Sequence, residues 1–466
     1  MTSRRRKILF LTHRVPFPPD KGDKIRTFHQ LDHLAVDHDV YCACFIDHPD
    51  DRVHAIALQR WCKGVFTVEW RPHRGMLRAV RALAGDRALS EAAYDDPRMH
   101  QQIDAWSSSI EFDAVVAFSA CMAPYARRAR ARRRVLDLCD SDSAKWQEYA
   151  AYSHFPMFAI YALEARRLRA LELACIEEFD ATAVISERER RTLDPTGTSP
   201  RLHVIANGVD LPYALPPQAS RQGPVVSFVG EMSYRPNRDG MTWFMHTAWP
   251  QVRARVRDAQ LMIVGRNPPA DIVRLAKMPG VTVTGEVPEV RRYLASSRVV
   301  IAPLRIARGM PNKVLEAMAM QRPVVATSSV AQCLDVEPGR QVLIDDEPTA
   351  FASQVVRLLE SECLCDRVAE SGYRHAAGRH SWSDTMRQYE QLLFPSQRPA
   401  QGKSNKSDRE AQFVRNQNTP VANRPATPFR SDFGRPIQTL TGKPYSAAAA
   451  GFAPSDWPSS RAQKLL

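Results

Sequence analysis

The sequence has no long apolar run. Its 466 residues are 44% hydrophobic and 25% charged, which is ordinary for a globular protein. No segment approaches the ~20 consecutive apolar residues that span a bilayer. The start, MTSRRRKILFLTHR, is basic, but its apolar stretch is too short for a secretory signal and is better interpreted as a first core strand. We therefore expect a cytoplasmic protein without a membrane span.

The spacings of metal-binding and redox cysteines are also missing. The nine cysteines are scattered, and the close pairs Cys42/Cys44 and Cys363/Cys365 are each separated by one residue. That gap fits neither a zinc site nor a thioredoxin-like motif. We expect reduced thiols and no metal.

Two further signatures are absent. The segment THRVPFPPDKG after the first predicted strand lacks the G-x-G-x-x-G loop of a nucleotide-dependent dehydrogenase. No zinc finger, helix-turn-helix or basic platform interleaved with aromatic residues indicates nucleic-acid binding. We therefore expect no nucleic-acid partner, although the basic surface keeps that hypothesis open to a salt-dependence test.

Positive charge is in excess, with a net charge of +13, and such a surface suits an anionic partner. Within residues 74–83, RGMLRAVRAL, apolar residues recur at helical spacing while arginines occupy other positions. This pattern is compatible with a helix that lies on an anionic membrane surface. The alternative is the solvated face of an ordinary packed helix.

Short β-branched apolar runs alternate with helical patterns in two series, which predicts two parallel sheets covered on both faces. The first series comprises residues 8–11, 40–46, 65–68, 114–118, 135–138, 182–185 and 202–205. The second comprises residues 225–229, 261–264, 281–284, 299–302, 324–326 and 342–344. The chain also exceeds the length that one hydrophobic core supports. The fold class is therefore α/β with two Rossmann-like domains.

The domain boundaries follow from composition. We expect an N-terminal domain over residues 1–212, a proline-rich linker over 213–224 and a second domain over 225–378. A final capped helix is predicted within 379–395. Residues 396–466 are polar and interrupted by proline, so we expect a disordered tail.

Residues 305–327 are the most informative segment. A glycine turn at Gly309 precedes a helix with Pro311 in its first turn, followed by a buried strand at 323–326. The unpaired N–H groups of a helix N-terminus suit a phosphate. Lys313 and Glu316 are three residues apart and can face one ligand, the cation towards phosphate and the carboxylate towards ribose hydroxyls. The alternative is an amphipathic helix with a surface ion pair.

This segment resembles the donor-site helix of retaining GT-B glycosyltransferases of family four. It is most similar to the sugar transferases associated with exosortase and PEP-CTERM exopolysaccharide systems. Four other segments resemble the same group in the same order: KILFLTHRVPFPPDKGDKIRTFHQL, LDLCDSDSAKW, VIANGVD and FVGEMSYRPNRDG. The resemblance covers about residues 7–395.

The resemblance implies a GT-B fold, in which an N-terminal acceptor domain and a C-terminal donor domain face each other across a cleft. It implies that the helix at 379–395 returns to the N-terminal domain. The implied activity is transfer of a sugar from a nucleotide sugar to a lipid-linked acceptor in exopolysaccharide synthesis, with retention of configuration and no cofactor. Such an enzyme would work at the inner face of the membrane.

Sugar transfer requires a diphosphate to be held while its negative charge grows. Asp140-Ser141-Asp142 follows a predicted strand and is the type of motif that a metal-dependent transferase carries. It lies in the N-terminal half, away from the donor helix, and the family that the chain resembles does not use a metal in this way. Arg305 and Lys313 are then the expected cations.

Several further residues are donor-site candidates. At the helix mouth these are Gly309, Met310 and Asn312. Gly230 ends the first strand of the second domain, where a phosphate should approach. Many relatives carry a basic residue just after this glycine, whereas this chain has Glu231. The candidate replacements are Arg235 and Arg238, unless they are solvated turn residues, and Arg266 is a candidate near the base.

One position departs from the resemblance. The wider family has two glutamates around this helix; Glu316 matches the second, and Arg308 stands where the first would hold the donor sugar. Arg308 either reads a charged sugar, binds diphosphate or is simply exposed. This departure also supports a second hypothesis, a catalytically silent GT-B protein that binds a nucleotide or a glycan.

The acceptor side is predicted in the N-terminal half. Gly22 lets the backbone approach a ligand, while Lys21, Lys24 and Arg26 make its loop basic. This loop either closes over the donor phosphates, receives a phosphorylated lipid acceptor, or is a plain connection.

The ends of two predicted strands complete the acceptor side. Asp140, Asp142 and Lys145 follow one strand, and Ser119 ends another. A carboxylate there could accept the proton of the acceptor hydroxyl. In front-side attack, however, the departing phosphate can take that proton instead.

Overall fold

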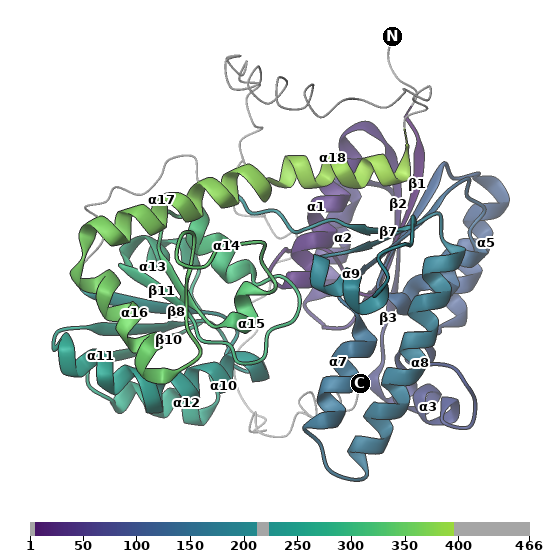
Figure 1. Cartoon of the computed structure of the whole chain (residues 1–466). Coiled ribbons are helices and arrows are strands. Elements are labelled where there is room, and N and C mark those ends of the chain that lie inside the picture. Colours follow the sequence, from purple (N-terminus) through teal and green to yellow (C-terminus); the bar gives the residue numbers. More distant parts are fainter. Residues whose placement is uncertain (1–4, 212–222, 396–466) are drawn as a thin grey trace, which may run out of the picture. The chain divides into compact units, whose positions relative to one another are not determined.

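The computed structural model describes residues 5–211 and 223–395. Most of the predicted linker and all of the predicted tail lie outside the described residues. Within them, the chain forms two parallel sheets, each with helices packed against it (Figure 1). None of the described helices combines the length and the apolarity that crossing a membrane requires.

The first sheet contains seven parallel strands in the order β3-β2-β1-β4-β5-β6-β7. Their bounds are β1 Lys7–Thr12, β2 Asp39–Ile46, β3 Cys62–Glu69, β4 Ala114–Phe118, β5 Arg134–Cys139, β6 Ala181–Val184 and β7 Leu202–Val204. Every run predicted in this half is a strand, with ends shifted by at most a few residues. The central strand β4, AVVAF, is buried along its whole length, because helices cover both faces of a parallel sheet.

Nine α-helices accompany this sheet in the described part of the N-terminal half. They are α1 Gly22–Asp37, α2 Asp51–Ala57, α3 Pro72–Ala82, α4 Leu89–Ala93, α5 Pro97–Ser109, α6 Ala123–Arg128, α7 Asp142–Ala151, α8 Met157–Glu178 and α9 Glu187–Leu193. Alternate residues of β1 face opposite layers. Ile8 and Phe10 pack in a cluster with Leu31 of α1, whereas Leu9 and Leu11 pack in another with helices that include α5 and α8.

The second sheet contains six parallel strands in the order β10-β9-β8-β11-β12-β13. Their bounds are β8 Val225–Val229, β9 Gln260–Val264, β10 Val281–Gly285, β11 Val299–Ala302, β12 Val324–Ala326 and β13 Leu343–Ile344. The helices of this half are α10 Arg235–Trp243, α11 Trp249–Arg255, α12 Ala270–Arg274, α13 Val290–Ser296, α14 Asn312–Ala319, α15 Ser328–Ala331, α16 Pro348–Glu360 and α17 Glu362–Arg379. One large cluster of buried residues joins them to the sheet.

The apolar spacing of residues 240–256 predicts one long amphipathic helix, but the structure interrupts it. The π-helical turn Phe244–Ala248 separates α10 from α11. Pro250 lies in the first turn of α11, and because proline has no N–H it cannot continue the α-helical hydrogen bonding of the preceding turn. The sequence pattern showed the apolar face of this helix but not the change in hydrogen bonding.

The last helix, α18 Trp382–Leu393, packs against the first sheet rather than the second. Tyr389 and Leu393 belong to the buried cluster that contains Ile8 and Phe10 of β1. The Glu390 carboxylate also lies 3.1 Å from a ring nitrogen of His33 in α1. In Figure 1, α18 lies beside α1, and α17 lies over the second sheet. Helix α18, which follows α17, thus ties the second half of the described chain to the N-terminal half.

Candidate functional site

The loop between β11 and α14 forms a sharp turn in front of the helix. Gly309 has φ of +67°, a left-handed conformation that favours glycine. Pro311 is the N-cap of α14, one residue before the position predicted for it, and Asn312 is the first helical residue. Val314 and Leu315 are buried, while Lys313 and Glu316 are partly exposed. The helix therefore presents a cation and a carboxylate near its open end.

Lys313 is held in place without a carboxylate partner. Its Nζ donates to Oδ1 of Asn237 at 2.6 Å and lies 4.3 Å from the ring centre of Phe228. Within residues 5–211 and 223–395, no carboxylate oxygen lies within 4 Å of this nitrogen. Burial lowers the pKa of Lys313 to about 7, with Glu316 acting weakly in the other direction. An anion that binds beside Lys313 would stabilise the charged form of its amine, which burial disfavours.

Gly230, at the end of β8, makes room for this lysine. A Cβ at Gly230 would lie 2.7 Å from Lys313 Nζ and 2.8 Å from Asn237 Nδ2. Asn237 also donates to the backbone oxygen of Glu231 at 2.8 Å. Sequence reasoning selected Gly230 and Lys313 but missed Asn237 and Phe228. The signal for Asn237 was its place in the first turn of the helix that follows the glycine loop.

Glu316 lies one turn further along the same face of α14. Burial raises its pKa to about 7, while Arg291 and Lys313 oppose that rise. The carboxyl group therefore changes charge near neutral pH. Hydrogen-bond donors from a ligand, such as ribose hydroxyls, would favour its ionised form.

The N-terminus of α1 approaches the N-terminus of α14. A Cβ on Gly22, the first residue of α1, would lie 3.9 Å from Nδ2 of Asn312. Lys21 is the N-cap of α1 and has no ion-pair partner among the described residues. Both helix N-termini carry partial positive charge, although in α14 the N–H groups of Asn312 and Val314 already donate to the backbone oxygens of Met310 and Pro311. The two helix ends thus bring partial positive charge together beside Lys21.

A hydrogen-bonded chain connects these two helix ends to the core of the first sheet. Asn312 Oδ1 accepts from Asn207 Nδ2 at 3.1 Å, and Asn207 Oδ1 accepts from Arg26 at 3.0 Å. Arg26 is fully buried and pairs with Asp137 of β5 at 2.7 Å. Asn207 lies in the VIANGVD segment quoted above, and the structure gives its side chain a direct contact with the first residue of α14.

Two predicted donor-site arginines are already paired within their own half. The exposed Arg305 pairs with Asp239, with Nε and Oδ2 3.0 Å apart. The exposed Arg238 pairs with Asp271 at 2.6 Å. Their charges are therefore largely neutralised, and their role at the donor phosphate stays a prediction. Lys313, in contrast to Arg305 and Arg238, has no carboxylate partner among the described residues.

Two other predicted cations, Lys24 and Arg266, also lie beside carboxylates. Lys24, expected to receive a phosphate, is buried against Asp51 at 2.8 Å. Arg266 lies between Asp20 and Glu231, at 3.1 Å and 3.4 Å respectively. Arg266 therefore joins the loop before α1 to the loop after β8. It supplies the positive charge next to Glu231, where the sequence comparison had expected a basic residue.

Two more candidates lie at the edges of the same region. The exposed Arg235 places its guanidinium 5.4 Å from the ring centre of Tyr152 in the N-terminal half. Met310 is partly buried and packs against the core of the second half.

Asp140 faces the turn in front of α14. A Cβ on Gly309 would lie 2.6 Å from its Oδ1, an atom that is buried and has no hydrogen-bond partner in the described structure. Burial and the nearby Glu189 raise the pKa of Asp140 to about 7. Cys139 before it and Ser119 at the end of β4 have φ of +60° and +75°. Strained backbone of this kind clusters at functional sites.

Arg308 pairs with carboxylates of the N-terminal half. Its Nε lies 2.6 Å from Glu148 Oε1, and its Nη1 lies 3.7 Å from Glu189 Oε1. Arg188 donates to the backbone oxygen of Ala307 at 2.7 Å. The side chain of Arg308 is 18% exposed, so the interpretation of a simply exposed arginine is wrong. Arg308 instead links the turn before α14 to α7 and α9.

The remaining acceptor-side candidates lie near Asp140. Asp142 and Lys145 form an i,i+3 pair at 3.8 Å on the first turn of α7. Ser119 Oγ lies 3.4 Å from Cys121 Sγ. In the described ranges, no three His, Cys, Asp or Glu side chains gather in a way that would hold a metal ion.

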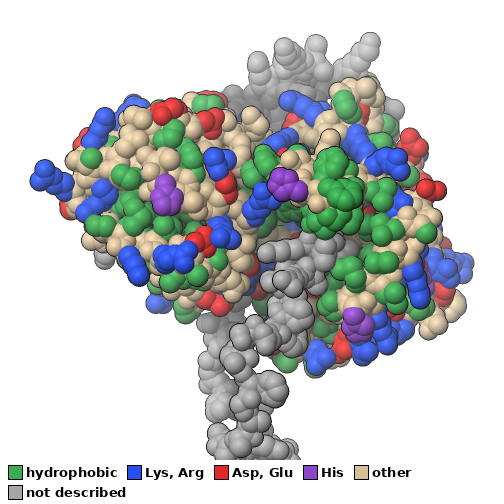
Figure 2. Space-filling model, turned by 90° about the horizontal axis from the view of Figure 1, so that it is seen from below, with side chains coloured by type: hydrophobic (Ala, Val, Ile, Leu, Met, Phe, Trp, Pro, Cys, Tyr) green, Lys and Arg blue, Asp and Glu red, His purple; other side chains and the backbone are tan. Residues whose placement is uncertain are grey.

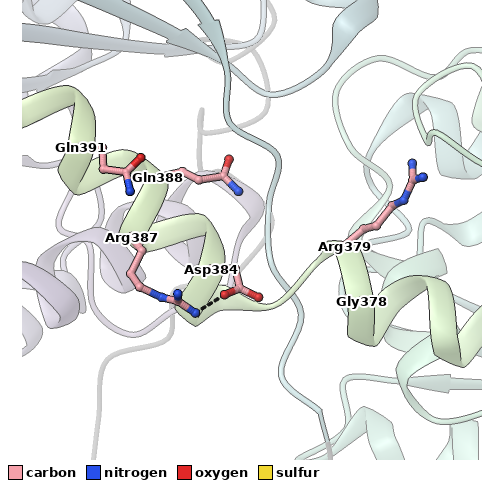
Figure 3. A pocket seen from close by; sticks show the side chains of 6 residues that line it. All are labelled: Gly378, Arg379, Asp384, Arg387, Gln388 and Gln391. Carbon is pink, nitrogen blue, oxygen red and sulfur yellow. Dashed lines mark hydrogen bonds and ion pairs between the residues drawn. The ribbon is translucent and has the colours of Figure 1, made fainter. Parts of the chain in front are cut away.

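A separate polar pocket lies where α17 meets α18 (Figure 3). Its lining residues are Gly378, Arg379, Asp384, Arg387, Gln388 and Gln391. Both arginines already have carboxylate partners, Arg387 with Asp384 and Arg379 with Asp335. This pocket therefore offers an anion no unpaired arginine, and the mouth of α14 is the stronger candidate site.

A family model matches the half of the chain that contains α14. Residues 223–361 match the family model described as Glycosyl transferases group 1. The match runs from just before β8 to just after α16 and includes all of α14. The second half of the chain thus carries a domain of this family. No curated protein matches the sequence.

Solved structures with a similar fold cover nearly the whole described chain. HepE from Anabaena in complex with UDP-glucose is 16% identical with a TM-score of 0.60, over 84% of this chain and 99% of that one. Sucrose-phosphate synthase from Thermosynechococcus elongatus is 17% identical with a TM-score of 0.63, over 83% and 98%. WaaG, a glycosyltransferase involved in lipopolysaccharide biosynthesis, is 15% identical with a TM-score of 0.57, over 84% and 100%. These similarities confirm the predicted GT-B fold.

Proposed function

We propose, from the group 1 glycosyltransferase domain and the GT-B fold, that this protein transfers a sugar from a nucleotide sugar to an acceptor hydroxyl. One observation carries the proposal: the N-termini of α1 and α14 approach each other beside a lysine without a carboxylate partner. A diphosphate is the ligand that this arrangement suits best. The complex of the similar HepE with UDP-glucose supports a nucleotide sugar as donor.

In the proposed reaction the bond between the anomeric carbon and the diphosphate oxygen breaks. The bond to the acceptor oxygen forms, and the nucleoside diphosphate leaves with the electron pair. Lys313 and the two helix ends stabilise the growing negative charge, because they are fixed before the reaction starts. Glu316 accepts hydrogen bonds from the ribose. The charge available at these groups supports a transfer that needs no metal.

The acceptor hydroxyl must lose one proton. Asp140 is one candidate to take it, because its carboxyl titrates near neutral pH and lies against the turn before α14. The departing phosphate is the other candidate, which would accompany front-side attack and retention of configuration. The resemblance to family four supports retention.

We further propose a lipid-linked acceptor in exopolysaccharide synthesis, at the cytoplasmic face of the membrane. The resemblance to transferases of PEP-CTERM systems supports this acceptor. The basic, partly apolar helix α3 supports contact with an anionic membrane. The similar WaaG takes part in lipopolysaccharide biosynthesis, which is compatible with a membrane-linked acceptor.

A thermal-shift screen with UDP-, GDP- and dTDP-sugars tests the donor. The matching donor should raise the unfolding temperature of the wild type, because ligand binding stabilises the folded state. Lys313→Ala should weaken binding about ten- to a hundredfold, the value of a charge-assisted contact. Lys313→Ala and Glu316→Ala should each abolish transfer. Lys277→Ala changes an exposed lysine of the same half and is the matched control.

The outcomes separate the main proposal from its alternative. Transfer that continues at the wild-type rate in both Lys313→Ala and Glu316→Ala would mean that the donor site lies elsewhere. Binding of a nucleotide sugar without any release of nucleoside diphosphate, across a range of acceptors, would favour the catalytically silent binding protein. Arg308 is the feature that favours this alternative, because it stands where the wider family has a glutamate that holds the donor sugar.

A further inference from the structure

Aromatic residues recur at every third position from the first helical turns after Asp140 onwards. They are Trp146, Tyr149, Tyr152, Phe155, Phe158 and Tyr161. The run covers α7, the turn after it and the start of α8. A three-residue spacing drifts around a helix of 3.6 residues per turn, so one face cannot bury all six rings. The glycosyltransferase site described above uses none of these rings directly.

The rings at the base of this helical hairpin pack on one another. The centre of the Trp146 ring lies 5.8 Å from that of Tyr149 and 5.1 Å from that of Tyr161. Trp146 also belongs to a small buried cluster with Leu168 of α8. These contacts join α7 to α8. Packing therefore accounts for three of the six rings, those of Trp146, Tyr149 and Tyr161.

The rings at the tip of the hairpin are exposed instead. Phe155 is 85% exposed, Phe158 is 51% exposed and Tyr152 is 59% exposed. Leaving large apolar side chains in water forgoes about 1.5–3 kcal/mol for each one that burial would gain. Contiguous exposed apolar surface marks a site of interaction.

Helix α3 adds a second exposed apolar row near the same hairpin. Leu77 and Val80 are 51% and 52% exposed, while Gly75 and Ala79 form its buried face. Arg167 of α8 donates to the backbone oxygens of Ala82 at the end of α3 and of Leu83 just after it. α3 is thereby fixed beside α8. The apolar row is therefore not covered by the rest of the described chain.

The charges on α3 complement an anionic surface. Arg74 and Arg81 are exposed and have no ion-pair partner among the described residues, and Pro72–Ala82 contains no acidic residue. Figure 1 shows α3 and the turn between α7 and α8 at the same end of the N-terminal half. Figure 2, which looks onto that end, shows hydrophobic side chains gathered on the face and Lys and Arg side chains along its edge.

We propose that the tip of the α7–α8 hairpin and the exposed row of α3 together dock onto an anionic lipid bilayer. Aromatic and aliphatic side chains enter the interface, and the arginines stay at the level of the lipid phosphates. Two separate elements share the contact, so the orientation of the protein on the bilayer is fixed. A single contact would restrict the tilt of the protein on the bilayer less.

The docking surface continues into the candidate site. The guanidinium of Arg235 lies over the ring of Tyr152, and α7 begins with Asp142, two residues after Asp140. A bilayer held at the hairpin tip therefore brings lipid-linked molecules towards the proposed acceptor side. This consequence rests on the proposed function, and docking extends the membrane contact of α3 proposed there, but docking can be measured without any transfer reaction.

The test is flotation of the full chain with vesicles. Wild type should float with phosphatidylcholine vesicles that contain phosphatidylglycerol. Phe155→Ala/Phe158→Ala should weaken this binding about a hundredfold or more, because two ring insertions are lost. Ile56→Ala/Val273→Ala removes two exposed apolar side chains from α2 and α12 and is the matched control. It should bind as wild type does.

A charge series tests the second element. Arg74→Gln/Arg81→Gln should weaken binding about tenfold or more to anionic vesicles, at about 1 kcal/mol for each arginine. It should change binding to pure phosphatidylcholine little. Arg255→Gln/Arg257→Gln removes two exposed arginines of the other half and should have no selective effect.

A third measurement reports insertion directly. Phe155→Trp should show a blue-shifted fluorescence maximum when anionic vesicles are added, because the indole leaves water. Wild type that does not float, or a tip variant that floats as well as its control, would overturn the docking proposal.

Release of nucleoside diphosphate with a soluble acceptor, measured without vesicles, should be the same in the tip variant and wild type. Loss of that release in wild type would count against the proposed function and leave docking standing.

Discussion

The carboxylate of Asp140 and the backbone of Gly309 are in such close contact that no side chain fits between them. A Cβ on Gly309 would lie 2.6 Å and 2.9 Å from the two carboxylate oxygens. The two residues come from different halves of the chain, one at the end of β5 and the other in front of α14. The proposed proton acceptor therefore lies directly against the turn that precedes the proposed diphosphate site.

Gly309→Ala should impair both folding and transfer. Gly309 and Gly285 both have positive φ, +67° and +70°, but a Cβ on Gly285 would meet no atom within 4 Å. Gly285→Ala should therefore show only the cost of the backbone conformation, about 1–2 kcal/mol. Gly309→Ala should add the clash with Asp140 and slow transfer at least about tenfold, through a shift of the turn before α14. Unfolding midpoints and turnover rates measure the two effects.

A double variant identifies the source of that extra cost. Asp140→Ala in the Gly309→Ala background should recover stability relative to Gly309→Ala alone, because the contact is removed while the strained φ remains. Equal destabilisation by Gly309→Ala and Gly285→Ala would show that the close contact has no energetic effect.

Nucleoside diphosphate binding should weaken as pH rises above neutrality. Burial holds the pKa of Lys313 at about 7 in the free protein, and a bound diphosphate must raise it because it favours the charged amine. Binding therefore takes up a proton between pH 7 and the pKa of the bound state. Affinity should fall by up to about tenfold for each pH unit in that window.

Calorimetry with UDP in two buffers of different ionisation enthalpy measures this proton uptake. Glu316 also titrates near pH 7 because burial raises its pKa, so Glu316→Gln is the variant in which the lysine is observed alone. A pH-independent affinity in that variant would mean that Lys313 does not contact the diphosphate.

Glu189→Gln should move the acid limb of the pH–rate profile to lower pH. Glu189 is buried, and its negative charge helps to raise the pKa of Asp140 to about 7. Removal of that charge lowers the pKa of Asp140, so its ionised form is present at lower pH. The dependence of kcat/KM on pH measures the shift. An acid limb that stays at the same pH would indicate that the phosphate, rather than Asp140, takes the proton.

Asp137→Asn should strongly destabilise the N-terminal half. Asp137 accepts hydrogen bonds from Arg26 and Gln30 in a site without solvent access. An uncompensated buried guanidinium costs about 3–5 kcal/mol. Asp104→Asn removes the partner of the exposed Arg128 and should leave the unfolding midpoint nearly unchanged. Chemical denaturation compares the two variants, and similar midpoints would contradict the structural role of the Arg26–Asp137 pair.

Much of the fold was predictable because buried parallel strands have a distinct composition. The runs at 114–118, 225–229, 299–302 and 324–326 coincide with β4, β8, β11 and β12. The interruption between α10 and α11 was not predicted, because hydrophobic spacing alone does not report which backbone hydrogen bonds are lost at Pro250.

The candidate site was predictable in part. Gly309, Lys313 and Glu316 are neighbours in the chain, so their shared helix mouth follows from local spacing. Asn237 and Asp140 are distant in the chain from that helix, and no local pattern indicates their contacts with Lys313 and Gly309. The exposed rings at the tip of the α7–α8 hairpin were also missed, since an aromatic repeat does not reveal which of its members are buried.

Amino-acid order alone decided that this chain builds two parallel sheets and presents a cation-bearing helix mouth in its second half. Those features depend on spacings of a few residues, and local sterics and hydrophobicity control them. The state of each charge was decided only in three dimensions. Arg305, Lys24 and Arg308 have carboxylate partners, and Lys313 has none in the described structure. Electrostatic energy depends on distance and solvent access, and both of these arise when segments far apart in the sequence are packed together.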